Sequence, residues 1–378
     1  MEVVRFTEMQ SLAEHAGAWN RLAGDVPFRT WQWLATWWRH YGSPGGLNVL
    51  AVFDRGELVG LAPWYRTRCP RRGRTLRLMG DGEICSEYVT VLSLPGMEQP
   101  VGEALACRLA ESSAEDAWDL LELSAVNPDD FCVKTLARRL AAAGCRLHTR
   151  AGPNCWRIPL PATWEDYLRA LSRNRRKALR QMERKFIDSG RAVLHRATGA
   201  GELGEACRIL ADLHERRRAM LGQTGCFSSR RYAAFHAEAM EWMLRQSRLG
   251  LYWMELDGEP AAAEYHLLGR EVVYCYQGGM APGRARVSPG QIATLMVLKD
   301  AIERGYRVFD FLRGDEPYKR QWRARRHGTV EIRIAGARPT ARVRHGLWLA
   351  ALELKQWLQG AAATADACST SPRPADCD

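Results

Sequence analysis

A carboxylate and an imidazole that could move a proton lie close together in the second half of the sequence. Glu264 and His266 are two residues apart within Pro260–Leu268, a stretch with the pattern of a β-strand. Side chains two apart on a strand share one face, so both could act on the same substrate. Either could be a general base, directly or through water. The structural alternative is a hydrogen-bonded pair without a chemical role.

A second group of reactive side chains, RGDEPYK, begins at Arg313, where a predicted strand ends. Tyr318 is a weak acid that could hydrogen-bond a leaving group, and Lys319 is a cation suited to an oxyanion or a phosphate. Asp315 is a third candidate. Two structural alternatives stay open: Asp315 could cap the next helix, and Tyr318 could be a core aromatic residue.

An anion site is predicted between these two groups. In SPGQ, Ser288 fits a helix N-cap, Pro289 the first helical position, and Gln291 the third residue of a capping box. The free N–H groups of a helix N-terminus attract anions, although a capping box can also do no more than start a helix. The preceding loop is expected to carry Gly278 and Gly279. The residues assigned to anion binding are Arg284, Arg286, Ser288, Gly290 and Gln291.

The elements that would position these groups form a βαβ unit. Val272–Tyr276 is β-branched and aromatic and predicts a strand, the helix runs from Ser288 to a C-cap at Gly305, and Arg307–Leu312 predicts the returning strand. Ligands of open α/β sheets bind at the carboxyl ends of the strands. The RGDEPYK cluster lies at such an end, which favours a functional role for it.

The two halves of the chain follow the same order of elements. GLNVLAVFDRGELVGLAPWY parallels GLYWMELDGEPAAAEYHLL, and each hairpin precedes a strand, a helix and a strand with an aspartate. The sequence therefore predicts an α/β protein with domains at residues 1–155 and 156–359, of which the second contains the reactive groups. A helix is expected at Ala341–Leu358, followed by a disordered tail at residues 360–378.

Basic charge is concentrated in one predicted helix, Trp164–Ile187. Eight basic residues against one acidic residue lie between Arg169 and Lys185, and they account for +7 of the formal net charge of +11. This pattern indicates no general nucleic-acid coat and no DNA partner. The helix presents either a solvated face or a patch for an anionic substrate. We assign Trp37, Arg176, Tyr276, Gln277 and Arg313 to substrate binding, with core packing as the alternative for Trp37.

Cysteine usage and hydropathy indicate an intracellular location. The eleven cysteines are scattered without metal-ligand spacing, so we expect reduced thiols, a cytoplasmic protein and no metal. The N-terminus does not read as a signal peptide, and no apolar run is long enough to span a membrane. We also expect no covalent intermediate, because no cysteine or serine has an evident base beside it in a motif.

The pattern YCYQGGM…SPG…LKDAIERGYRVFDFLRGDEPYKRQW resembles the CelD-type acetyltransferases, GNAT-superfamily proteins related to the FemAB transferases. The tryptophan-rich segment near Phe28 and LSRNRRKALRQMERK are also similar, and the resemblance covers about residues 5–335. It implies tandem GNAT-like domains with mixed sheets flanked by helices. It also implies acyl transfer from acetyl-CoA or another acyl-CoA to an amine or hydroxyl, in polysaccharide or cell-envelope biosynthesis.

One departure from the family concerns the pyrophosphate loop. The family reads R/Q-x-x-G-x-G/A, whereas here Arg284 begins a loop in which Pro289 removes one amide. Arg286 and the amides of Gly290 and Gln291 could compensate.

The expected function is an acyl-CoA-dependent N-acetyltransferase that acts by direct attack on a small-molecule or saccharide acceptor. The resemblance leaves two alternatives. One is an aminoacyl-tRNA-dependent transferase of the FemAB kind, with tRNA as partner. The other is a non-catalytic scaffold of polysaccharide biosynthesis.

Overall fold

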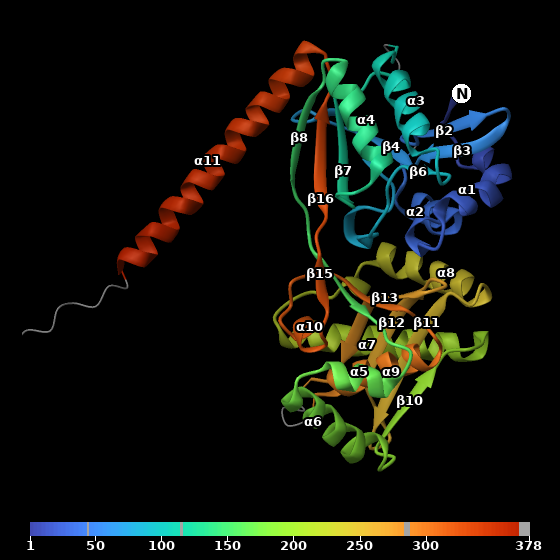
Figure 1. Cartoon of the computed structure of the whole chain (residues 1–378), viewed down its shortest axis with the longest axis vertical. Helices are drawn as coiled ribbons and strands as arrows, with labels where there is room; N and C mark the ends of the chain where they lie inside the picture. The colour runs from blue at the N-terminus through green and yellow to red at the C-terminus, as the bar shows by residue number, and fades with distance from the viewer. Residues whose placement is uncertain (44, 114–115, 283–287, 370–378) are drawn as a thin grey trace, which may run out of the picture.

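The computed structural model describes residues 1–43, 45–113, 116–282 and 288–369. It shows two α/β lobes, one above the other in Figure 1, joined by strands that cross between them. The predicted fold class, mixed sheets flanked by helices, is confirmed. The division at residues 155 and 156 stays a prediction, and one strand from beyond it, near residue 330, lies in a sheet of the first lobe.

The first lobe contains two sheets. One has the order β1-β2-β3-β6 and the other has the order β4-β5-β7-β16-β8. The strands are β1 (Glu2–Phe6), β2 (Val49–Asp54), β3 (Glu57–Ala62), β4 (Trp64–Cys69), β5 (Gly73–Leu78), β6 (Leu92–Ser93), β7 (Leu120–Val126), β8 (Arg146–Ala151) and β16 (Val330–Ala335). The helices are α1 (Ala16–Ala23), α2 (Trp31–Tyr41), α3 (Glu98–Ala110) and α4 (Phe131–Ala142).

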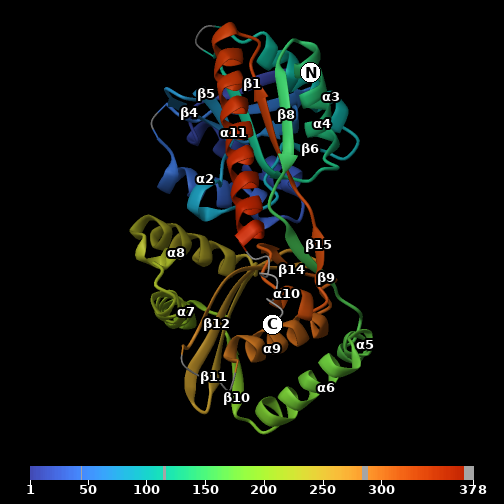
Figure 2. The same ribbon diagram turned by 90° about the vertical axis from the view of Figure 1, so that its left-hand side faces the viewer.

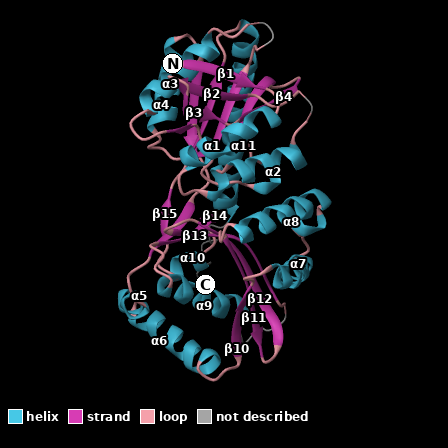
Figure 3. Cartoon of the chain, turned by 90° about the vertical axis from the view of Figure 1, so that its right-hand side faces the viewer, coloured by secondary structure: helices cyan, strands magenta, loops and turns pink. Residues whose placement is uncertain are grey.

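The second lobe contains one seven-stranded sheet of order β10-β11-β12-β13-β14-β9-β15. Its strands are β9 (Cys155–Pro159), β10 (Ala192–Arg196), β11 (Leu249–Leu256), β12 (Glu259–Leu268), β13 (Val272–Met280), β14 (Val308–Arg313) and β15 (Arg325–His327). Its helices are α5 (Trp164–Ala170), α6 (Arg173–Met182), α7 (Ala200–Met220), α8 (Arg230–Arg245), α9 (Pro289–Glu303) and α10 (Tyr318–Gln321). Figure 3 shows α7 and α8 on one side of this sheet and α5, α6 and α9 on the other.

Local sequence signals explain the hairpins that build both lobes. Asp257 and Gly258, between β11 and β12, have φ angles of 57° and 84°, which is the pattern of a type I′ turn. Arg55 and Gly56 repeat it between β2 and β3, with φ angles of 49° and 84°. Both turns match the hairpins predicted from DRG and DGE.

The βαβ unit predicted around the reactive groups is present. Strands β13 and β14 pair in parallel, and α9 connects them. Pro289 is the first residue of α9, as expected. The predicted capping box is wrong, because the Ser288 side chain makes no cap hydrogen bond. Gly278 and Gly279 lie in β13 and not in the following loop. Gly279 is required there, because a Cβ atom would lie 2.5 Å from the backbone nitrogen of His214 in α7.

Three other predictions of secondary structure need correction. The basic segment forms two α-helices, because Leu171 adopts an extended conformation and Ser172 caps α6, and Glu183–Ile187 is a π-helical turn. The sequence pattern of Glu87–Leu92 also predicts a strand, but the structure forms only the two-residue strand β6 at the end of this segment. The last helix does not stop at Leu358: α11 (Pro339–Ser369) projects from the first lobe in Figures 1 and 2, and residues 370–378 lie outside the described residues.

A buried polar cluster joins the lobes. Asp310 on β14 is fully buried and accepts hydrogen bonds from Arg157 Nε and Tyr88 Oη, both at 2.7 Å. The Arg157 guanidinium also lies 4.6 Å from the centre of the Tyr88 ring. Because a buried carboxylate without partners is costly, this cluster fixes β14 to the first lobe. Among the described residues no helix is both long and apolar enough to cross a membrane.

Candidate active site

A cavity of about 440 Å³ lies in the second lobe where β13 and β14 separate. The two strands pair only from Val272–Tyr274 to Val308–Asp310. Beyond these residues β13 continues to Met280 and β14 to Arg313 without pairing to each other. The divergence leaves a space that the first turn of α9 and the side chains of β12 and α10 also line.

Glu264 and His266 form a fixed pair on the wall of this cavity. His266 Nε2 lies 2.8 Å from one carboxylate oxygen of Glu264, and Thr294 Oγ1 donates to the other oxygen at 2.8 Å. The His266 side chain is 1% exposed, whereas the Glu264 side chain is 14% exposed. The sequence expectation that the two side chains share a face is therefore met. Glu264 is the member of the pair that a ligand can reach more easily.

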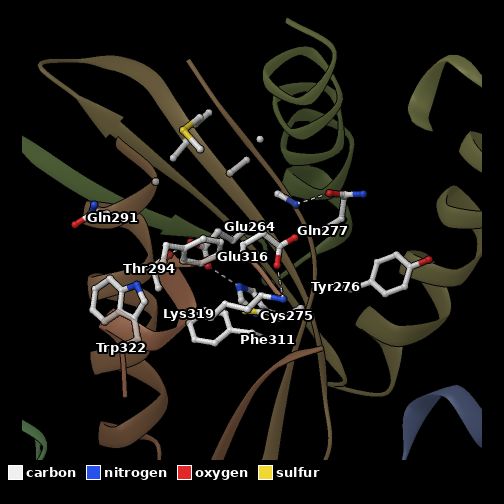
Figure 4. A pocket seen from close by; sticks show the side chains of 18 of the residues that line it. Glu264, Cys275, Tyr276, Gln277, Gln291, Thr294, Phe311, Glu316, Lys319 and Trp322 are labelled. Atoms are coloured by element: carbon white, nitrogen blue, oxygen red, sulfur yellow. Dashed lines mark hydrogen bonds and ion pairs between the residues drawn. The ribbon is translucent and has the colours of Figure 1, made fainter. Parts of the chain in front are cut away.

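Cys275 completes a cluster with this pair. The thiol, a His266 nitrogen and a Glu264 carboxylate oxygen all lie within 4.8 Å of one another. Figure 4 shows Cys275 and Glu264 converging inside the cavity. These residue types and distances also suit a metal ion, so the prediction that the protein uses no metal stays a prediction.

Tyr318 borders the cavity at the start of α10, and its ring packs edge-on against Phe311. The side chain is 42% exposed. The pKa of the Tyr318 phenol is raised above its usual 10. The main cause is partial burial, and the nearby Cys275 and Glu316 contribute less. The hydroxyl therefore keeps its proton and can donate it to a group in the cavity.

Lys319 also faces the cavity, but its ammonium group is already engaged. It is 2% exposed, donates to the carbonyl oxygens of Arg313 and Gly314 at 2.7 and 3.0 Å, and pairs with Glu316 at 2.9 Å. A buried ammonium with these partners holds the turn after β14 together. Its assignment to an oxyanion or a phosphate stays a prediction.

Asp315 lies outside the cavity lining. Its carboxylate accepts hydrogen bonds from Asn154 Nδ2 and Trp156 Nε1, both at 2.9 Å, and these bonds lower its pKa. The alternative helix-capping role is not found either, because α10 has no side-chain cap. The Asp315 carboxylate instead connects the turn after β14 to the segment at the start of β9.

The start of α9 forms one end of the cavity. Ser288, Gly290 and Gln291 line it, and their assignment to anion binding stays a prediction, whereas Arg284 and Arg286 lie outside the described residues. The Gln291 amide, which the sequence assigns to anion binding, already donates to the carbonyl oxygen of Ser288 at 3.0 Å.

Arg175 of the basic helix α6 reaches the same end of the cavity. Its Nη1 donates to Gln291 Oε1 at 3.3 Å, and its guanidinium lies 4.6 Å from the centre of the Trp322 ring. The second terminal nitrogen, Nη2, is buried and makes no hydrogen bond within the described structure. Arg176, the residue that the sequence assigns to substrate binding, instead donates to the carbonyl oxygens of Arg169 and Leu171 at the end of α5.

The remaining predicted substrate residues divide between the cavity and the lobe interface. Gln277 and Arg313 line the cavity, and Arg313 also pairs with the buried Glu87 of the first lobe. Tyr276 lines the cavity too, but its hydroxyl donates to the Ile84 carbonyl oxygen, and Figure 4 shows the ring pointing away from Lys319. Trp37 is 2% exposed in the first lobe and donates to the carbonyl oxygen of Asp81. It is therefore a core packing residue, which was the alternative to substrate binding.

Sequence reasoning missed Cys275, Thr294, Glu316, Trp322 and Arg175. One signal could have found Cys275: the three residues Gly269–Glu271 join β12 to β13, and a hairpin this short places Cys275 opposite His266. The other four come together only through packing between helices and loops.

Comparisons with known proteins agree with this geometry. Residues 173–320 match the family model described as acetyltransferase (GNAT) domain. This range contains β12, β13, α9 and every residue that lines the cavity except Trp322, so the cavity belongs to a GNAT acetyltransferase domain and the protein is an acyltransferase enzyme. A comparison with curated proteins finds no match.

Solved structures share the fold over nearly the whole chain. FemX is 12% identical, with a TM-score of 0.61 over 91% of this chain and 99% of FemX. The C-terminal domain of a putative lysylphosphatidylglycerol synthetase from Agrobacterium fabrum is 10% identical, with a TM-score of 0.53 over 89% and 95%. A conserved protein of unknown function from Bacteroides thetaiotaomicron is 11% identical, with a TM-score of 0.53 over 88% and 100%. At these identities the likeness concerns the fold alone.

Proposed function

We propose that the protein transfers an acyl group, in the first instance acetyl, from acyl-CoA to an amine or hydroxyl of a sugar or polysaccharide precursor related to the cell envelope. The acceptor class follows from the CelD-type resemblance. The observation that carries the acyl-CoA donor is that one cavity joins the separated strands to the first turn of α9 and to the Glu264–His266 pair.

Each end of this cavity suits one part of an acyl-CoA. The amide of Gly290, with the guanidinium of Arg175, would bind the pyrophosphate. Beyond Tyr274, β13 stays paired with β12 but no longer pairs with β14, and this edge of β13 would bind the extended pantetheine arm in the manner of an added strand. This arrangement directs the thioester toward the centre of the cavity.

The groups near the thioester would supply the chemistry. The Glu264–His266 pair would take the proton that the acceptor loses, and Tyr318 would donate its proton to the departing CoA thiolate. Because His266 is buried and Thr294 fixes the Glu264 carboxylate, the pair is oriented before any substrate binds.

Calorimetric titration of the full-length protein with acetyl-CoA and with free CoA tests this proposal. We expect binding of both, and Arg175→Ala should weaken it by about 1–3 kcal/mol, the value of a charge-assisted hydrogen bond. Arg180→Ala is the matched control, because Arg180 is an exposed residue of the same helix and pairs with Glu165. Absence of binding to the wild-type protein would refute the acyl-CoA donor.

An aminoacyl-tRNA donor is the second candidate, and the exposed basic residues of α6, among them Arg173 and Lys177, favour it. A tRNA complex would weaken steeply as the salt concentration rises, because phosphate contacts release counterions. Salt-dependent binding of tRNA without binding of acetyl-CoA would select this candidate. A well-folded protein that binds neither would be a scaffold. We also propose a cytoplasmic location, which rests on the acyl-CoA donor and on the nine free thiols of the described residues.

A further inference from the structure

Arg217 lines the cavity, and the roles described above do not use it. It belongs to the last turn of α7 and is partly buried there. Its two neighbours in sequence have polar partners: Arg216 pairs with Asp212 at 3.2 Å, and Arg218 Nη1 donates to Gln223 Oε1 at 2.7 Å. The Arg217 guanidinium has no hydrogen-bond or ion-pair partner among the described residues.

The other charged groups that line the described part of the cavity are already paired. The pairs are Glu264 with His266, Glu316 with Lys319, and Arg313 with Glu87 of the first lobe. Arg217 therefore leaves the cavity with one uncompensated charge, and that charge is positive. A cation in a partly enclosed site of this kind attracts an anionic ligand.

The position of Arg217 separates it from the region assigned to the pyrophosphate of the donor. Helix α7, which carries Arg217, covers one side of the sheet, whereas α6 and α9 cover the other (Figure 3). Figure 4 shows the same division inside the cavity, with Gln291 of α9 on one side of Glu264 and Gln277 on the other. A donor bound at α9 leaves the α7 side of the cavity open to the second substrate.

A purely structural role does not account for this residue. Cations in the last turn of a helix stabilise its dipole, but Arg218 already supplies one there and does not line the cavity. Lys319 and Arg313, the other cavity cations with long side chains, each hold another segment in place through their partners. Arg217 holds none, so its substitution should change ligand binding and leave the urea midpoint of unfolding unchanged.

We propose that the acceptor carries an oxyanion, as a phosphorylated or carboxylated saccharide does, and that Arg217 binds this group. The inference rests on the proposed function, because it names the acceptor class of the same site. The planar guanidinium offers parallel N–H groups that match a phosphate or a carboxylate. This contact holds one end of the acceptor while the amine or hydroxyl at the other end reaches Glu264. Two contacts orient the attacking atom, whereas a neutral acceptor makes only one of them.

Titration calorimetry of the full-length protein in the presence of free CoA tests the assignment. The probes are glucosamine, phosphorylated glucosamine and muramic acid, which share one amine and carry no anion, a phosphate and a carboxylate. We expect the wild type to bind at least one charged sugar about tenfold or more tightly than glucosamine, as for a charge-assisted hydrogen bond. The charged sugar that binds more tightly identifies phosphate or carboxylate as the recognised group. Arg217→Ala should abolish the preference, and Arg217→Lys should keep part of it, because the charge remains without the planar fork.

Arg216→Ala and Arg218→Ala are the matched controls, because they remove a cation from the same end of α7 but not from the cavity lining. Both variants should bind the three sugars as the wild type does. Equal binding of charged and neutral sugars by the wild type, or an unchanged preference in Arg217→Ala, would overturn the anionic acceptor and leave the acyl-CoA donor intact. Weaker binding of acetyl-CoA by Arg217→Ala would also overturn it and assign the guanidinium to the donor. Failure of the wild type to bind acetyl-CoA would refute the proposed donor, whereas titration with the sugars alone would still decide whether Arg217 binds an oxyanion.

Discussion

At the scale of single residues, the cavity separates groups that can react from groups that hold the site in place. Tyr318 is exposed to the cavity, whereas Lys319, its neighbour in sequence, is 2% exposed and bound by carbonyl oxygens. Adjacent side chains on a helix point about 100° apart around its axis, so Tyr318 and Lys319 lie in different surroundings. Their roles can be tested independently.

Tyr318→Phe should lower turnover by roughly ten to a thousandfold with little change in acetyl-CoA affinity, because only the acid is lost. The assay is release of CoA thiol with a panel of amine and sugar acceptors. Because the pKa of Tyr318 is raised above 10, the wild-type rate should not fall through loss of this proton below pH 10. Tyr306→Phe, in a tyrosine outside the cavity lining, is the control. Full turnover of Tyr318→Phe at saturating substrates would make Tyr318 a packing residue.

Lys319→Ala should destabilise the protein by about 3 kcal/mol or more, because two carbonyl oxygens and the Glu316 carboxylate lose a buried partner. Urea unfolding measures the loss. Lys299→Ala is the control, since Lys299 is 36% exposed and its pair with Glu183 should contribute about 1 kcal/mol or less. A stable Lys319→Ala protein that has lost only activity or donor binding would restore the role predicted from the sequence.

At the scale of elements, the helices pack against β13 so closely that glycine is needed at one point. Strand β13 contacts α7, and Gly279 faces the α7 backbone. The sequence shows a pair of glycines after a strand, which resembles the beginning of a loop. Only the packing of α7 reveals that they continue the strand, and local patterns do not contain that information.

Gly279→Ala should lower the free energy of unfolding by about 1–3 kcal/mol, because the new methyl group must displace the α7 backbone near His214. The matched control is Gly204→Ala within α7, where nothing lies within 4 Å of the added Cβ. That change should raise stability by about 0.5–1 kcal/mol through helix propensity. Thermal unfolding of both variants checks the pair, and equal effects would contradict the close approach of α7.

Much of the fold and part of the site could be predicted because their signals are local. The DGE hairpin, the helix that begins at Pro289 and the parallel strands around it each depend on a few adjacent residues. Glu264 and His266 share a face for the same reason. Arg175 and Thr294 could not be assigned, because α6 and α9 bring them to the cavity from separate parts of the chain.

At the scale of the whole molecule, the chain returns from the second lobe to add a strand to the first. Strand β16, near the end of the described chain, lies between β7 and β8 of the first lobe and appears in Figure 1 as an orange strand among green ones. Strand β9, which follows β8, pairs with β14 of the second lobe. A sequence read as two consecutive units does not show the return of β16 to the first lobe, because each strand has the pattern of a strand wherever it pairs.

The position of β16 predicts that the first lobe depends on a strand from the second half of the chain. A fragment of residues 1–154 lacks β16, so β7 and β8 lose their common neighbour, and the buried Ile334 leaves the core. We expect this fragment alone to show no cooperative unfolding and rapid proteolysis, since an open hydrophobic strand edge is unstable and prone to aggregate. Coexpression with residues 155–378 should restore a protease-resistant complex that copurifies. A fragment 1–154 that unfolds cooperatively without its partner would show that β16 only covers a lobe that is already complete.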